Sequence, residues 1–151
     1  MATIIERYES LEKKLEIKLN DIDKELISAP QDLQACAELA ADANDEEHTA
    51  KLALDVVSAE VAARLRESVE GRKPRSESQI ASEVPLAPEV QKARDEYNGT
   101  RHQAEVCRSL VESMRVKASL IRNVCDMTIA GYITPTSYRP ERVRLMRGKE
   151  A

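Results

Sequence analysis

The feature that most constrains this chain is a forty-residue stretch, 88–127, with no proline after its first residue. Apolar or small side chains recur along it in alternating steps of three and four residues, the heptad spacing of a helix that packs against other helices. They are Val90, Ala93, Tyr97, Thr100, Ala104, Cys107, Val111, Met114, Ala118, Ile121 and Cys125. One helix of this length spans about 60 Å. Its apolar stripe needs partner helices, from the same chain or from other copies.

The composition supports a helical protein with an aliphatic core. The chain has no Phe, no Trp and only 4 Gly, and 33% of its residues are charged. This mixture is typical of long helices and coiled coils. We therefore predict an all-α fold, a long-helix antiparallel bundle or coiled coil that assembles into a homo-oligomer.

The second half of the long stretch is where we expect copies of the chain to meet. A second apolar row, which includes Val106, Leu120 and Met127, widens the stripe there. The predicted oligomerisation residues are Cys107, Leu110, Val111, Met114, Ala118, Ile121 and Val124.

The other elements follow from apolar periods and capping signals. We predict helices at about 3–28, 31–70, 77–83 and 88–127, in a single helical domain over 1–130, followed by a basic C-terminal tail over 131–151. Proline disfavours the α conformation in the residue before it, so Pro30 should end the first helix at Ala29. Thr3 with Glu6 predicts a capping box, Ser76 an N-cap, Pro88 a first helical residue and Gly131 a C-cap.

Charge is distributed unevenly along the chain. Residues 1–70 carry 8 Lys and Arg against 17 Asp and Glu, whereas residues 71–151 carry 15 against 10. Such asymmetry indicates a surface that binds polyanions, or head-to-tail contact between copies; ordinary solvated helix faces are the alternative. Three basic groups stand out: a turn around residues 64–75, an arginine every seven residues from Arg94 to Arg122, and the tail.

Motifs for catalysis are absent from the sequence. It contains no Walker loop, GxGxxG, GxSxG or HExxH, and its two histidines are far apart in the chain. We predict no enzyme activity, no cofactor and no metal site. The three cysteines, Cys36, Cys107 and Cys125, have no CxxC spacing, and we expect buried free thiols in a reducing compartment. No apolar run is long enough to cross a membrane.

The order of features in the second half resembles the UvsY-type recombination mediators of tailed phages. In that family a helix with a Lys-Ala-Arg-Leu-like sequence leads into a basic loop, a short helix that opens with Ser/Thr-Glu, and a long assembly helix. Here these features are Ala63-Arg64-Leu65, the basic turn, Ser76-Glu77-Ser78-Gln79-Ile80 and Pro88-Glu89-Val90, within roughly residues 50–128. Ala62 stands where the family has its lysine.

The resemblance implies a function and a set of partners. The chain would form ring-shaped homo-oligomers of six or seven subunits through its C-terminal helix and bind single-stranded DNA. It would help to load a RecA-like recombinase in exchange for single-strand-binding protein during recombination and repair. The expected location is the cytoplasm, that of the host cell if a phage encodes the protein. The predicted DNA-binding residues are Arg64, Arg66, Arg72, Lys73 and Arg75.

Two questions stay open at the level of sequence. The alternative function is a coiled-coil structural or scaffolding protein with no role on DNA. If DNA is bound, the arginines from Arg94 to Arg122 and the tail compete with the basic turn as the main contact.

Overall fold

The computed structural model describes residues 3–18, 21–67 and 75–131, and all regular elements in these ranges are helical. In chain order they are α1 (Ile4–Glu12), the 3-10 helix η1 (Lys13–Leu15), α2 (Ile22–Arg66), α3 (Glu77–Glu83), the 3-10 helix η3 (Val84–Leu86) and α4 (Pro88–Ile129). The all-α prediction is confirmed for this part of the chain. Among its helices, none has the length and apolarity that crossing a membrane requires.

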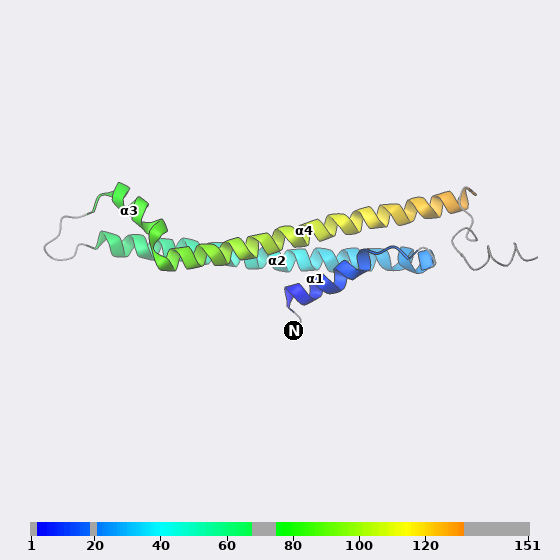
Figure 1. The fold of residues 1–151 in the computed structure, drawn as a ribbon, viewed down its shortest axis with the longest axis horizontal. Coiled ribbons are helices and arrows are strands. Elements are labelled where there is room, and N and C mark those ends of the chain that lie inside the picture. The colour runs from blue at the N-terminus through cyan, green and yellow to red at the C-terminus, as the bar shows by residue number, and fades with distance from the viewer. Residues whose placement is uncertain (1–2, 19–20, 68–74, 132–151) are drawn as a thin grey trace, which may run out of the picture. The chain divides into compact units, whose positions relative to one another are not determined.

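The contacts divide the chain into two compact units, and each contains part of both long helices. The first unit comprises Met1–Leu39 with Arg108–Ala151, and the second comprises Ala40–Cys107. Within each unit the α2 segment lies beside the α4 segment and runs in the opposite direction (Figure 1). The antiparallel pairing of long helices is thereby confirmed inside each unit. The homo-oligomer and the single domain over 1–130 stay predictions.

The apolar stripe of α4 forms the core-facing side of the helix, as its spacing predicts. None of its eleven members is exposed. The buried ones are Val90, Ala93, Ala104, Cys107, Val111, Met114 and Ile121. From α2 the core takes Cys36, Leu39, Ala40, Ala43 and Val61. Many of these side chains are small, which lets helix axes approach closely.

Four predicted helix ends are confirmed. Thr3 and Glu6 form a capping box before α1, and Ser76 forms another with Gln79 before α3. Pro88 is the first residue of α4, where its missing N–H costs no helical hydrogen bond. After α4, Gly131 has a φ of 76°, a left-handed conformation that glycine adopts without steric cost.

The prediction of one helix over 3–28 is wrong. Its apolar period continues through the region, yet α1 and η1 end at Leu15, Glu16 is extended, and α2 begins at Ile22. In one continuous helix, Lys14 and Asp32 would lie about 27 Å apart. In the structure Lys14 Nζ lies 2.7 Å from Asp32 Oδ1, so the break lets the chain fold back on α2.

The predicted helix boundary at Pro30 is also wrong, because α2 continues through this proline. Proline cannot donate to the carbonyl of Leu26, four residues earlier, which costs roughly 3 kcal/mol in a helix interior. Pro30 is exposed, and Leu26 is 43% exposed, so water can reach this turn. Burial of Cys36 and Leu39 further along the helix offsets the cost. At its other end α2 stops at Arg66, and residues 68–70 of the predicted helix lie outside the described residues.

A buried ionic cluster holds the folded-back N-terminal segment in the first unit. Lys117 on α4 is only 6% exposed, and its Nζ lies 2.5 Å from Glu25 Oε2 on α2. The same ammonium group donates to the backbone carbonyls of Lys14 and Glu16, the latter at 3.1 Å. This cation on α4 thus joins α2, η1 and the extended residue that follows η1. A buried charge requires this many partners.

Replacement of Lys117 with methionine should destabilise the protein strongly. Methionine keeps most of the side-chain volume but leaves Glu25 and the two carbonyls without their donor. Removing one partner of a buried ion pair costs about 3–5 kcal/mol, and we expect a loss of this size in the free energy of unfolding measured with urea.

The matched control is Lys92→Met, because the Lys92 side chain is 81% exposed and lies 3.9 Å from Glu96. An exposed pair of this kind contributes about 0–1 kcal/mol. Equal losses in the two variants would contradict the role assigned to Lys117.

Candidate nucleic-acid interface

Three of the five predicted DNA-binding residues lie close together in the second unit. Arg64 and Arg66 occupy the last turn of α2, and Arg75 lies just before α3. Arg72 and Lys73 lie outside the described residues. The structure therefore brings the C-terminal end of α2, the beginning of α3 and the beginning of α4 to one place.

Each of these three arginines pairs with a different glutamate. Arg66 binds Glu77 of α3 through two hydrogen bonds of 2.9 and 3.0 Å. Arg64 Nη2 donates to Glu89 Oε1 in the first turn of α4. Arg75 Nε lies 3.3 Å from Glu83 Oε2 at the end of α3. The sequence predicts these arginines as DNA contacts, but it does not identify their carboxylate partners.

All six side chains remain open to solvent, with exposed fractions between 41% and 73%. Exposed ion pairs add little to stability, because water screens the attraction and both side chains lose freedom. These pairs are therefore not needed to hold the helices together. Their partners can be exchanged for another anion.

Two of the three glutamates, Glu77 and Glu89, have a lowered pKa. A hydrogen bond from Arg66 is the main cause of the lowered pKa of Glu77, and Glu77 in turn raises the pKa of Arg66. The pKa of Glu89 is lowered chiefly by a hydrogen bond from its own backbone, and secondly by Arg64. Glu77 and Glu89 therefore carry full negative charge at neutral pH.

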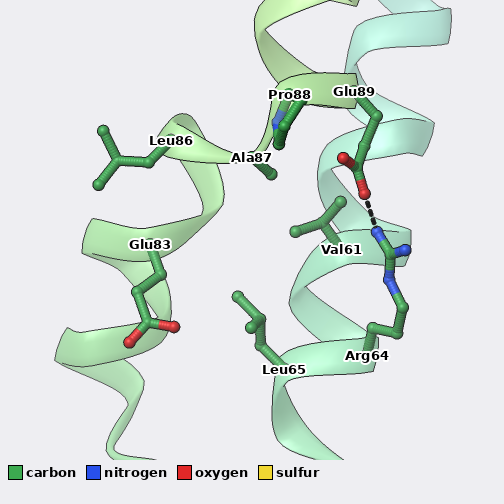
Figure 2. Close-up of a pocket in the computed structure, with 8 residues that line it drawn as sticks. All are labelled: Val61, Arg64, Leu65, Glu83, Leu86, Ala87, Pro88 and Glu89. Atoms are coloured by element: carbon green, nitrogen blue, oxygen red, sulfur yellow. Dashed lines mark hydrogen bonds and ion pairs between the residues drawn. The ribbon is translucent and has the colours of Figure 1, made fainter.

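A hollow of about 450 Å³ lies beside the Arg64–Glu89 pair. Figure 2 shows Val61 and Leu65 of α2 facing the gap toward α3, whereas Leu86 points away from them. Glu83, Ala87 and Pro88 complete its lining. The lining side chains include no hydroxyl, thiol or imidazole, and carry charge only on one arginine and two glutamates. This arrangement suits binding, and it offers no hydroxyl, thiol or imidazole as a nucleophile.

The five arginines of α4 form the other described basic group. Arg94, Arg101, Arg108, Arg115 and Arg122 are all exposed. Two of them pair along their own helix, Arg101 with Glu105 at 3.2 Å and Arg115 with Glu112. Between residues 98 and 125, α4 has two acids, Glu105 and Glu112, against four exposed arginines. This stretch is more positive than the described residues of the junction of α2, α3 and α4.

The predicted oligomerisation residues lie mostly in the core of the chain itself. Five of the seven are buried, and Ala118 and Val124 are half-buried. The buried five are Cys107, Leu110, Val111, Met114 and Ile121. The apolar character of these five is explained within one copy of the chain, and their role in oligomerisation stays a prediction.

Comparison with known proteins gave no match: no family model, no curated protein and no solved structure is similar to this chain. The resemblance to the UvsY-type mediators stays a prediction. In the described part of the chain, no three His, Cys, Asp or Glu residues lie close enough together to hold a metal ion.

The pairing of Arg66 with Glu77 predicts a measurable change in one pKa. In an Arg66→Gln variant the pKa of Glu77 should rise toward that of a free glutamate, because its main hydrogen-bond donor is lost. A carbon-detected NMR titration of the Glu77 carboxyl group measures this. Arg94→Gln, a substitution elsewhere in the same unit, should leave the pKa unchanged. An unchanged value in Arg66→Gln would show that the pair does not persist in solution.

Proposed function

We propose that this protein is a non-enzymatic recombination mediator. It binds single-stranded DNA and helps to load a RecA-like recombinase in exchange for single-strand-binding protein. The order of motifs between residues 50 and 128 supports the class of function. The structural observation that carries the proposal is the exposure of all five heptad-spaced arginines on α4.

The spacing of these arginines suits a flexible polyanion. Neighbours seven residues apart lie about 10 Å from each other along one side of a helix. Each arginine that meets a phosphate releases a counterion, which favours binding without regard to base sequence. Stacking contributes little, because α4 offers one aromatic side chain, Tyr97, and it is half-buried. Affinity per chain should be modest, so several linked copies would gain from avidity.

Substitution of Arg108, Arg115 and Arg122 with glutamine should weaken binding to an oligothymidylate. We expect the slope of log affinity against log salt to become shallower by about 0.7 for each lost phosphate contact. The loss should be similar for strands of different sequence, because no base edge is read. Fluorescence anisotropy at several salt concentrations measures both quantities.

The matched control replaces three lysines of the acidic half, Lys13, Lys24 and Lys51, with glutamine. It removes the same charge from exposed positions of η1 and α2. If the two variants lose affinity equally, α4 is not the contact and only net charge matters. If the unaltered protein binds no oligothymidylate at low salt, the proposal fails.

One observation favours the alternative, a structural or scaffolding protein. The first unit exposes apolar side chains that its own core does not use: Ile5, Leu26, Ile27, Val116, Leu120, Met127 and Ile129. Val116, Leu120 and Met127 lie four and seven residues apart, along one side of α4. A row of this kind is where protein partners, including further copies of the chain, would bind. The mediator proposal also needs such a surface, since it requires an oligomer.

Two aspartate substitutions should distinguish the role of the buried side of α4 from that of its exposed apolar row, Val116, Leu120 and Met127. Val111→Asp places a charge at a buried position, which costs several kcal/mol and lowers the unfolding midpoint. Leu120 is 47% exposed, so Leu120→Asp should change stability by no more than about 0.5 kcal/mol. Light scattering should show that Leu120→Asp reduces the mass of any oligomer. An oligomer that survives Leu120→Asp would place the contact elsewhere.

A further inference from the structure

The pairing of all three described arginines at the α2–α3–α4 junction has a consequence for how this surface meets nucleic acid. Arg64, Arg66 and Arg75 are the described members of the basic turn, yet each is matched by one carboxylate. Glu60 and Glu67 line a second hollow beside Arg64. These described residues comprise five acids and three arginines, so the described part of the junction has no excess of positive charge.

We infer that Glu77, Glu83 and Glu89 restrain the three arginines, and that the junction is a second contact for single-stranded nucleic acid which opens only when these carboxylates are displaced. The glutamates act as internal competitors for the phosphate groups. This inference rests on the proposed DNA-binding function, and it adds that three glutamates weaken DNA binding at the junction.

The chemistry of the pairs supports exchange. A phosphate oxygen accepts the same guanidinium hydrogen bonds that a carboxylate oxygen accepts, and Arg66 already presents two donors as a fork. Because the pairs are exposed, a strand can reach them without opening the core. A single phosphate gains little by displacing one carboxylate. With three pairs at one junction, a strand should therefore bind there only when several of its phosphates displace carboxylates together.

The restraint should be visible in the salt dependence of binding. When a paired arginine meets a phosphate, the strand releases condensed cations, but the freed glutamate attracts cations in turn and repels the strand. In the intact protein, this junction should therefore contribute little to the salt dependence of the affinity for DNA. Substituting the glutamates should steepen the slope of log affinity against log salt by at most about 0.7 for each arginine.

The test is a triple variant, Glu77→Gln, Glu83→Gln and Glu89→Gln, titrated with an oligothymidylate. We expect tighter binding and a slope steeper by up to about 2, which makes the loss of affinity between 50 and 200 mM salt roughly 10- to 20-fold larger. Glutamine keeps the shape and still accepts a hydrogen bond. Helical circular dichroism and the melting temperature check the fold. Glu77→Gln alone, with about a third of the effect, is the fallback if the triple variant melts early.

The control variant removes the same charge from the same unit without releasing an arginine. Asp45, Glu46 and Asp55 are exposed on α2, away from the junction in sequence, and are changed to Asn, Gln and Asn. A change in net charge alone predicts equal gains in the two triple variants, and that result would overturn the inference.

A second comparison tests the arginines directly. Changing Arg64, Arg66 and Arg75 to glutamine should alter the slope little in the intact protein, but should remove the whole gain in the glutamate-substituted protein. If the arginine substitutions already lower the slope by about 2 in the intact protein, the arginines meet DNA unrestrained and the inference is wrong. If the intact protein binds no DNA at all, the proposed function fails first, and the two failures are thereby distinguished.

Discussion

The apolar stripe of α4 is the constraint on which the rest of the structure depends. With no Phe or Trp in the chain, the core must be built from many small contacts along long helices. Each unit therefore needs a segment of α2 against a segment of α4, and the buried positions include the small side chains of Cys36, Ala40, Ala104 and Cys107. Such a core is thin, so short elements such as α1 need additional contacts to stay in place.

The two units use charge in opposite ways. In the first unit Lys117 is buried and its partner Glu25 on α2 is only 12% exposed, so the cluster holds a particular arrangement of three segments. In the second unit the pairs of Arg64, Arg66 and Arg75 lie in water. The first kind of pair is costly to break, and the second exchanges easily. An anionic ligand can therefore displace a carboxylate only from a pair of the second kind.

Because Val111, Met114 and Ile121 are buried inside one chain, the heptad pattern of α4 is not by itself evidence for an oligomer. The heptad pattern is equally consistent with a partner from the same chain and with a second copy, because both cover a stripe in the same way. The structure shows that the stripe is covered from within. Val116, Leu120 and Met127 remain exposed on the same helix, and they form the apolar surface that α4 leaves available to another protein.

The sequence by itself determined the helical class, the buried face of α4 and the ends of α3 and α4, because these depend on local period and on capping by nearby residues. It also predicted a glycine turn at Gly131. It did not reveal the break after Leu15, because the apolar period runs on unchanged, whereas the bonds of Lys14 and Lys117 that favour the fold-back join distant residues. Nor did it reveal that Lys117, between Met114 and Ile121 on the apolar side, is buried. Only the tertiary structure decided which carboxylates meet Arg64, Arg66 and Arg75. Their partners lie 25, 11 and 8 residues away on other segments, and a local pattern carries no information about pairs at such separations.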